Sequence, residues 1–208
     1  MPSRSKRVFF EDLVFVVDEN VYEPAEDSFL FAENLDVKEG ERVLDMGTGC
    51  GILGITAAKK ARKVIAIDIN PYAIRCAKQN ATLNHVRSKL DFVQGDLFTP
   101  LSKTAKFDVI FFNAPYLPTD ENEVKSWVDH AWAGGTMGRQ VIDQFIPETS
   151  NHLKTAGRIF LMQSTLASLD KTITMFTKYN FVTTVVADAS LPFFETIVLL
   201  RATKNYCR

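Results

Sequence analysis

Four consecutive residues, Asn113, Ala114, Pro115 and Tyr116, follow an apolar run and are suited to hold a planar NH₂ group. The lone pair of such a nitrogen is delocalised, so the nitrogen reacts only when it is aimed at an electrophile. The Asn113 side-chain oxygen and the Ala114 carbonyl can each accept one N–H, and Pro115 restricts Ala114 to extended geometry. Tyr116 can pack on the planar group. Taken alone, the tetrapeptide favours a simple strand-end turn, because Asn and Pro are common there. A cofactor site nearby would favour chemistry.

Such a site is indicated by Asp45-Met46-Gly47-Thr48-Gly49-Cys50-Gly51, which follows a strand and opens a helix. Glycines let the backbone pass beneath a ligand, and Asp45 can accept hydrogen bonds from a cationic amino group. About twenty residues later, Asp68 ends the next strand, where a carboxylate can accept both ribose hydroxyl hydrogens. Asp96 follows the third strand, where it can accept a proton from an adenine amino group. S-adenosylmethionine carries all three groups and is the predicted cofactor, with S-adenosylhomocysteine as the product.

A dinucleotide site is the competing interpretation, because Gly49-x-Gly51-x-x-Gly54 also satisfies the G-x-G-x-x-G fingerprint. Two features favour S-adenosylmethionine. An acid precedes the glycines on the first strand, and three acids follow three successive strands. A dinucleotide site has no use for a carboxylate beside its pyrophosphate.

The elements that must position these residues alternate between apolar runs and helical segments, which is typical of a parallel sheet with crossover helices. After a β-rich start over 8–17, strands are predicted at 42–46, 63–68, 90–94, 107–112, 157–162, 181–187 and 194–201. Helices are predicted at 52–60, 71–83, 138–153 and 166–179.

A short turn at 190–192 predicts that the last two strands form an antiparallel hairpin. The fold class expected is therefore α/β, a Rossmann-like class I methyltransferase with a seven-stranded, mostly parallel sheet and a C-terminal antiparallel hairpin. Residues 1–208 are predicted to form a single domain, with 1–27 as a β-rich extension. The third strand should be a sheet edge, where apolar Leu90 and Phe92 would suit strand addition by a partner. The long connection 113–137 is expected to be functional.

Composition excludes several classes of protein. Lys and Arg number 24 against 25 Asp and Glu, for a formal net charge of −1, so the basic balance of a nucleic-acid-binding protein is missing. Cys50, Cys76 and Cys207 lack the spacing of a zinc site, so no metal is expected. No signal or membrane-spanning segment is indicated, and a cytoplasmic protein is predicted. The histidines, His85, His130 and His152, are interpreted as structural or solvent-facing.

The sequence also resembles a known family. Asn113-Ala114-Pro115-Tyr116 resembles the (Asp/Asn/Ser)-Pro-Pro-(Tyr/Phe) motif of amino methyltransferases, with Ala114 in place of the usual first Pro. Residues 21–28, 131–135 and 138–139 are similar to the archaeal and eukaryotic branch of the HemK-like methyltransferases. This resemblance implies N5-methylation of the glutamine in the Gly-Gly-Gln motif of a peptide-chain release factor. It also implies a possible partner, a small zinc-binding activator protein, and docking of the release factor through the catalytic domain or that partner.

The site residues that follow from motif and resemblance form three sets. The reaction is assigned to Asn113, Ala114, Pro115 and Tyr116. The cofactor is assigned to Asp27, Ser28, Asp45, Gly47, Thr48, Gly49, Asp68, Ile69, Asp96, Leu97 and Asn113, with Asp27 and Ser28 closing over its methionine end. Substrate contacts are assigned to Tyr22 and Trp132, although packing explains Trp132 equally well.

Two other functions stay open at this stage. The same tetrapeptide would serve a nucleic-acid base amine, adenine N6 or guanine N2, equally well. A non-catalytic, cofactor-binding scaffold is the second alternative, and the intact Asn113 and Tyr116 disfavour it.

Overall fold

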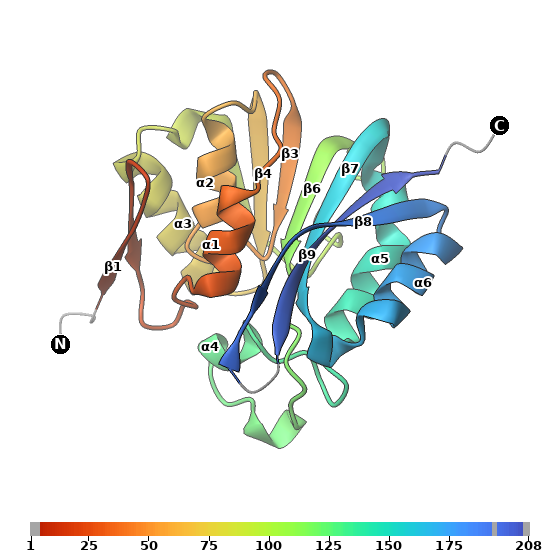
Figure 1. The fold of residues 1–208 in the computed structure, drawn as a ribbon. Coiled ribbons are helices and arrows are strands. Elements are labelled where there is room, and N and C mark those ends of the chain that lie inside the picture. Colours follow the sequence, from red (N-terminus) through yellow and green to blue (C-terminus); the bar gives the residue numbers. More distant parts are fainter. Residues whose placement is uncertain (1–4, 193–194, 206–208) are drawn as a thin grey trace.

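The computed structural model describes residues 5–192 and 195–205, which form a seven-stranded sheet with helices on both faces and a separate two-stranded hairpin (Figure 1). The strands are β1 (Lys6–Phe10), β2 (Leu13–Val17), β3 (Arg42–Met46), β4 (Lys63–Asp68), β5 (Leu90–Gln94), β6 (Phe107–Asn113), β7 (Leu153–Ser164), β8 (Phe181–Ser190) and β9 (Thr196–Lys204). The helices are α1 (Glu26–Glu33), α2 (Ile52–Ala58), α3 (Pro71–Leu83), α4 (Trp127–His130), α5 (Gln140–His152) and α6 (Leu169–Lys178).

The large sheet has the order β5-β4-β3-β6-β7-β9-β8. Strands β3 to β7 pair in parallel, whereas β9 is antiparallel to both β7 and β8. The predicted fold class, a mostly parallel seven-stranded sheet with a C-terminal antiparallel hairpin, is therefore confirmed. From β3 the chain adds β4 and β5 on one side of the sheet and then crosses to add β6 and β7 on the other, so the strand order reverses between β3 and β6. Ligands in open α/β sheets bind at the carboxyl ends of strands at such a reversal.

Helices cover the two faces of the sheet as separate layers. In Figure 1, α1, α2 and α3 lie on one side of the sheet and α5 and α6 on the other. Each face has its own apolar core. Phe31 of α1 packs edge-on against Phe111 of β6, with ring centroids 5.6 Å apart. On the opposite face, Phe112 of β6 packs against Phe145 of α5, with centroids 4.6 Å apart. Strand β6 is thus held from both sides, which fixes the position of the residues that follow it.

The N-terminal hairpin is attached to α3 by two asparagines one helical turn apart. The Asn80 side chain accepts from the Val16 N–H at 2.9 Å and donates to the Val16 carbonyl at 3.0 Å. Asn84 makes the same pair of hydrogen bonds with Val14, at 3.0 Å and 2.7 Å. Each carboxamide therefore satisfies both polar groups of a β2 residue, as a neighbouring strand would. This docking directs the chain that leaves β2 toward the carboxyl end of the sheet.

Several element boundaries differ from those predicted. Helix α5 ends at His152, and β7 begins at Leu153 rather than at residue 157, because Leu153 already pairs with Phe107 before a register shift. Helix α6 begins at Leu169, after a turn of 3-10 helix over Thr165–Ala167, rather than at residue 166. The predicted start of the last strand, residue 194, lies outside the described residues.

Helix α1 was not predicted at all. Its N-cap is Ala25, which makes no capping hydrogen bond, and the helix has only eight residues, so its local signal is weak. Burial of Phe31 against the sheet stabilises it instead.

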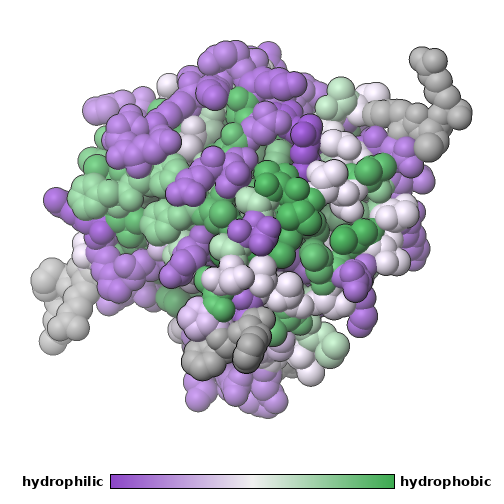
Figure 2. Space-filling model, in the orientation of Figure 1, coloured by the Kyte–Doolittle hydropathy of each residue, from purple (hydrophilic) through white to green (hydrophobic). Residues whose placement is uncertain are grey.

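The two edges of the sheet differ. Strand β5 is an edge, as predicted, but Leu90 is fully buried and offers nothing to a partner, which corrects that part of the prediction. Phe92 is half-buried, and the Arg87 guanidinium lies over its ring, 5.2 Å from the ring centroid. On the other edge, β8 exposes Val182, Val185 and Val186, and Figure 2 shows apolar side chains gathered over this part of the surface. The register shift between Val185 and Ala187 breaks the regular pairing pattern of β8, which discourages edge-to-edge association.

Within the described residues, no helix is long and apolar enough to cross a membrane. The same residues contain no cluster of His, Cys, Asp and Glu side chains able to hold a metal ion. Cys50 and Cys76 are buried thiols, whereas Cys207 lies outside the described part of the chain.

Candidate active site

A cavity of about 870 Å³ opens at the carboxyl ends of β3, β4, β5 and β6. It brings together residues from separate stretches of the chain, from Val21 to Gln144. Every residue assigned to the site from the sequence lines this cavity, except Asp45. The lining residues among those assigned are Tyr22, Asp27, Ser28, Gly47, Thr48, Gly49, Asp68, Ile69, Asp96, Leu97, Asn113, Ala114, Pro115, Tyr116 and Trp132.

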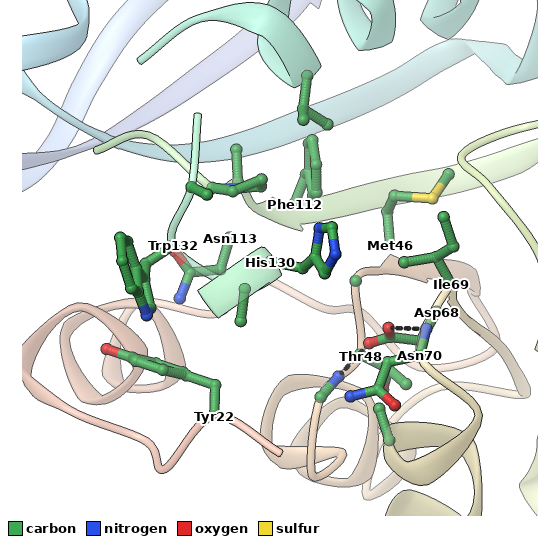
Figure 3. A pocket seen from close by; sticks show the side chains of 18 of the residues that line it. Tyr22, Met46, Thr48, Asp68, Ile69, Asn70, Phe112, Asn113, His130 and Trp132 are labelled. Atoms are coloured by element: carbon green, nitrogen blue, oxygen red, sulfur yellow. Dashed lines mark hydrogen bonds between the residues drawn. The ribbon is translucent and has the colours of Figure 1, made fainter. Parts of the chain in front are cut away.

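The cavity has two halves, which Figure 3 shows from close by. The cofactor half consists of the glycine loop, residues 47–50, together with 68–70 and 95–97. The acceptor half consists of the reaction tetrapeptide, residues 113–116, together with Tyr22, Asp27 and Trp132. In Figure 3, Tyr22 and Trp132 lie on one side of the view and Asp68 on the other, with His130 between them.

Asp68 anchors the cofactor half. Its Oδ2 accepts the Gly49 N–H at 2.8 Å and its Oδ1 accepts the Asn70 N–H at 2.9 Å, so it joins the end of β4 to the glycine loop. Burial raises the pKa of this carboxyl, and the backbone N–H donors of Asn70 and Gly49 oppose the rise. Each carboxylate oxygen can accept a further hydrogen bond. Asp68 can therefore hold the loop and bind a pair of hydroxyl groups at once.

Asp45 does not line the cavity, although the sequence predicts its contact with the ligand. Its carboxylate lies behind the glycine loop, where Oδ2 accepts from the Thr48 hydroxyl at 2.6 Å and from the Gly54 N–H at 3.0 Å. Burial raises the pKa of Asp45 to about 7, and the nearby Asp68 charge adds to the rise, against the lowering effect of those two donors. The structure thus gives Asp45 a role in shaping the loop. Its direct contact with a ligand stays a prediction.

Gly47 allows the glycine loop to pass close to β6. Its φ is +64°, a region that favours glycine, and a Cβ there would lie 3.3 Å from the Phe112 ring. The loop therefore lies against the end of the strand that carries Asn113. This contact places the two halves of the cavity side by side.

Asp27 is the central hydrogen-bond acceptor of the acceptor half. Its Oδ2 accepts from the Asn113 side-chain NH₂ at 3.0 Å and from the Tyr116 hydroxyl at 3.2 Å. Its Oδ1 accepts from the Tyr22 hydroxyl at 3.2 Å and from the Ser28 N–H and hydroxyl at 2.6 Å and 3.1 Å. Asp27 is only 7% exposed. One buried carboxylate therefore ties the first and last residues of the reaction tetrapeptide to α1.

The orientation of the Asn113 carboxamide follows from this network. A carboxylate only accepts hydrogen bonds, so the NH₂ of Asn113 has to face Asp27. The Asn113 Oδ1 is buried and accepts no hydrogen bond from any residue that the structure describes. A buried, unpaired acceptor is unfavourable unless a ligand supplies the donor. Asn113 Oδ1 is thus a buried acceptor without a donor among the described residues, and its contact with an incoming N–H stays a prediction.

The phenols of the acceptor half stay protonated at neutral pH. Burial is the largest cause that raises the pKa of Tyr116, and the Asp27 charge raises it further. The same two causes raise the pKa of Tyr22. Both hydroxyls are therefore hydrogen-bond donors to Asp27 and are poor candidates for a general base.

The connection from 117 to 138 closes the acceptor half. Leu117 pairs with the segment at 132–134, donating its N–H to the Trp132 carbonyl at 2.9 Å and accepting from the Gly134 N–H at 2.8 Å. Gly138 has a φ of +67°, and a Cβ there would lie 2.3 Å from the Tyr116 carbonyl oxygen. This close approach explains the glycines around 134–138. Helix α4, which lies below the sheet in Figure 1, begins at a capping box formed by Ser126 and Asp129.

Some lining residues were not predicted from the sequence. Asn70 caps α3 as expected, accepting the Tyr72 N–H at 2.9 Å, and it also lines the cavity. His130 and Trp127 line the cavity from α4, with ring centroids 5.7 Å apart, so the interpretation of His130 as structural or solvent-facing is incomplete. No local sequence signal places α4 over the site. His152, by contrast, is structural: it stacks on Phe98 at 4.9 Å.

The charge of the cavity distinguishes between the two cofactors considered. Three carboxylates, those of Asp27, Asp68 and Asp96, line it, and no lysine or arginine among the described residues does. A pyrophosphate would lack a cationic partner there and would face acids, so the cavity disfavours a dinucleotide. A cation with hydroxyl and amino donors fits this lining. The residues present therefore suit S-adenosylmethionine.

Solved structures share this architecture. The E. cuniculi Mtq2–Trm112 complex, described as responsible for methylation of the eRF1 translation termination factor, matches with a TM-score of 0.69 at 24% identity, over 89% of this chain and 99% of that chain. Methanocaldococcus jannaschii Trm5 in complex with adenosine matches with a TM-score of 0.72 at 22% identity, over 99% of this chain and 57% of that chain. The fold is that of the Rossmann-like methyltransferases.

Curated relatives define the family. A Methanocaldococcus jannaschii protein named as a protein N5-glutamine methyltransferase is 44% identical over 181 residues, 86% of this chain and 90% of that protein. Human methyltransferase HEMK2 is 36% identical over 155 residues, 69% of this chain and 71% of that protein. The release factor glutamine methyltransferase of Lactococcus lactis is 32% identical over 165 residues, 73% of this chain and 59% of that protein. A family described as ribosomal protein L11 methyltransferase matches residues 27–115. The chain belongs to the HemK-type protein N5-glutamine methyltransferases and is a methyl-transferring enzyme.

Proposed function

We propose that this enzyme transfers the methyl group of S-adenosylmethionine to the side-chain amide nitrogen of the glutamine in a Gly-Gly-Gln motif of a peptide-chain release factor. The names of the relatives support this substrate, and so does the sequence resemblance. The observation that carries the proposal is the buried Oδ1 of Asn113, which accepts no hydrogen bond from the described residues. This oxygen can accept an N–H of a planar amide.

S-adenosylmethionine supplies an electrophilic methyl group when it is bound. In the proposal, Asp68 holds its hydroxyl groups, Asp96 and Leu97 hold its base, and the glycine loop passes beneath it. Asn113 donates its side-chain NH₂ to Asp27 and Ser28, so these two residues adjoin the reaction tetrapeptide. Direct contacts of Asp68, Asp96, Leu97 and Ser28 with the cofactor are part of the proposal.

The chain contributes mainly orientation. Asn113 accepts one N–H of the glutamine amide through Oδ1, the Ala114 carbonyl accepts the other, and Tyr116 packs on the amide plane. Aiming the nitrogen lone pair in this way accounts for a large part of the acceleration expected of such a site. No protein base has to act beforehand, because the nitrogen becomes acidic once it carries the methyl group. The protonated phenols of Tyr22 and Tyr116 agree with this.

The surroundings of the site support a protein substrate. Among the described residues the lining is acidic and has no lysine or arginine, so it gives phosphates of DNA or RNA no favourable contact near the acceptor half. Methylation of a translation factor would place the enzyme in the compartment of protein synthesis, the cytoplasm, and requires no metal in this site. A small activator protein remains a proposed partner. The similar Mtq2–Trm112 structure is a complex of two proteins, and β5, an edge strand, would offer such a partner a strand to pair with.

The test is transfer of labelled methyl from S-adenosylmethionine to a purified release factor and to its variant with Ala in place of the Gly-Gly-Gln glutamine, with DNA and RNA in parallel. Label on the unmodified factor alone is the expected result. Label on nucleic acid would favour base methylation instead. Absence of label, both alone and with an added activator protein, together with intact S-adenosylhomocysteine binding, would favour a cofactor-binding scaffold.

A further inference from the structure

We infer that Asp27 is a positioning residue, which determines whether the Asn113 carboxamide offers an acceptor or a donor to the methyl acceptor. The inference rests on the proposed function, in which Asn113 Oδ1 receives an amide N–H. It departs from the sequence-based assignment of Asp27 to the cofactor. The contact that carries it is the 3.0 Å hydrogen bond from the Asn113 NH₂ to Asp27 Oδ2.

A carboxamide has two ends of nearly equal shape and opposite hydrogen-bonding character, so only its partners select its orientation. At Asn113 the NH₂ end has two acceptors, Asp27 Oδ2 at 3.0 Å and Ser28 Oγ at 3.4 Å. The Ser28 hydroxyl donates its own proton to Asp27 Oδ1, so it faces Asn113 with a lone pair. Asp27 therefore directs both contacts, one of them through Ser28.

Replacement of Asp27 by Asn would reverse this orientation for a definite reason. The main-chain N–H of Ser28 lies 2.6 Å from Asp27 Oδ1, and a main-chain N–H can only donate. The oxygen of the new carboxamide must therefore stay at the Oδ1 position. Its NH₂ then occupies the Oδ2 position, where it faces the NH₂ of Asn113. Two donors cannot pair, so Asn113 rotates and turns its own NH₂ toward the substrate amide.

The position of Asp27 is itself determined by packing. Asp27 and Asn113 are 86 residues apart in the chain, and α1 reaches β6 because Phe31 packs on Phe111. Asp27 lies in the first turn of α1, where a negative charge is favourable. A buried, well-packed carboxylate of this kind holds Asn113 in one orientation.

The experiment compares Asp27→Asn with the wild type in methyl transfer to the release factor, and measures S-adenosylhomocysteine affinity by calorimetry. We expect kcat to fall about 100-fold, the scale of a misaimed reacting group, with a smaller change in cofactor-product affinity. Asp108→Asn is the matched control. Asp108 also accepts a main-chain N–H, from Arg42 at 2.8 Å, but lies at the opposite end of the sheet. Its kcat should remain at the wild-type value.

A second variant separates orientation from simple structural support. In Asp27→Asn combined with Asn113→Asp, the carboxylate at position 113 can accept from the new NH₂ at position 27 and still offer an oxygen to the substrate. We expect kcat to recover at least about 10-fold over Asp27→Asn alone. Loss of S-adenosylhomocysteine affinity with kcat preserved at saturating cofactor would instead assign Asp27 to the cofactor and overturn the inference. Failure of the double variant to recover kcat would do the same.

Failure of the proposed function gives a different result. If the wild type labels no release factor, the substrate proposal fails, while the inference is still tested by NMR of ¹⁵N-labelled asparagine side chains. The Asn113 NH₂ signals are assigned by their absence in Asn113→Ala. The NH₂ hydrogens should exchange slowly with solvent in the wild type, and this exchange rate should change in Asp27→Asn. This measurement also serves if Asp27→Asn does not fold. Exchange of the wild-type Asn113 NH₂ as fast as that of an exposed asparagine would contradict the inference.

Discussion

The two halves of the cavity are built in different ways. The cofactor half consists of short segments at the ends of three adjacent strands, and its central carboxylate, Asp68, accepts hydrogen bonds from main-chain N–H groups. The acceptor half is assembled from a strand end, the first turn of α1 and a returning loop. Its central carboxylate, Asp27, accepts from four side chains and from one main-chain N–H, and these donors lie up to 89 residues away in sequence.

This difference has a consequence for what each half tolerates. Main-chain hydrogen bonds survive most changes of side chain, so the cofactor half depends on few residue types. Side-chain hydrogen bonds in a buried network depend on every member, because one lost partner leaves another buried group unpaired. Substitutions in the cofactor half should therefore mainly change cofactor affinity, whereas substitutions in the acceptor half should mainly change kcat.

The largest difference between the effect on kcat and the effect on cofactor affinity is expected for Asn113→Ala. Removal of the buried acceptor should lower kcat about 100- to 1,000-fold, the range seen when one positioned hydrogen-bonding group is removed from an active site. Affinity for S-adenosylhomocysteine should change much less. Single-turnover transfer of labelled methyl and calorimetry measure the two effects. Asn122→Ala, in the exposed part of the connecting loop, is the control. A kcat of Asn113→Ala within tenfold of the wild-type value would contradict the assignment of Asn113.

Asp68→Ala should have the opposite pattern. Loss of a carboxylate that holds the glycine loop, and that we propose accepts from the cofactor hydroxyl groups, should weaken S-adenosylhomocysteine binding about 10- to 100-fold, since hydrogen bonds to charged groups contribute about 1.5–3 kcal/mol. At saturating cofactor, kcat should be close to that of the wild type. Asp91→Ala removes a carboxylate from neighbouring β5, outside the cavity, and should bind normally. Equal affinity in both variants would disprove the role of Asp68.

Gly138→Ala tests the contact between the returning loop and the tetrapeptide. The added Cβ would lie 2.3 Å from the Tyr116 carbonyl oxygen, in backbone with a positive φ, so the loop must shift. We expect a loss of about 1–3 kcal/mol in the free energy of unfolding and a several-fold lower kcat. Gly40→Ala is the control, because its φ is also positive but its Cβ would meet nothing within 4 Å. A kcat equally low in both variants would show that strain, and not the Tyr116 contact, causes the loss.

The pH dependence of Asp45 concerns the free energy of unfolding, and its effect on methyl transfer is expected to be the smallest. Burial raises its pKa from 3.8 to about 7, so the native state binds this proton more tightly than the unfolded chain does. The unfolded state loses the proton first as the pH rises, and the contribution of Asp45 to stability therefore falls between about pH 4 and pH 7. Urea unfolding of the cofactor-free enzyme should show that Asp45→Asn gains stability relative to wild type over this window. A difference that does not change with pH would rule out this titration.

The cofactor half was the easier to predict from the sequence. Its glycines and acids follow strands whose apolar runs mark them clearly, and parallel strands bring their carboxyl ends to one edge. Asp68 and Asp96 do line one cavity, whereas their contacts with the cofactor stay predictions. Asp45 is the exception, because the pattern shows that it precedes the loop but not that its carboxylate turns behind it.

The acceptor half could be predicted only in part. Tyr22, Asp27 and Trp132 came from resemblance, and nothing in their local sequence shows that Asp27 contacts Asn113 rather than the cofactor. Helix α1 has no capping side chain and forms through burial of Phe31 on β6. His130 enters the site from a helix of four residues, too short to leave a periodic pattern.

By itself, the sequence determined the α/β class, the succession of strands and helices along the chain and the residue types at the strand ends. Hydrophobic periodicity and glycine positions are local properties, so a sequence shows them directly. Tertiary structure alone decided that Asp27 joins Asn113 to Tyr116, that Asp45 lies behind the loop and that Leu90 is buried at the sheet edge. The contacts of Asp27 and the burial of Leu90 depend on packing between segments distant in the chain, which leaves no spacing pattern to detect. The position of Asp45 depends on how the glycine loop folds around its carboxylate.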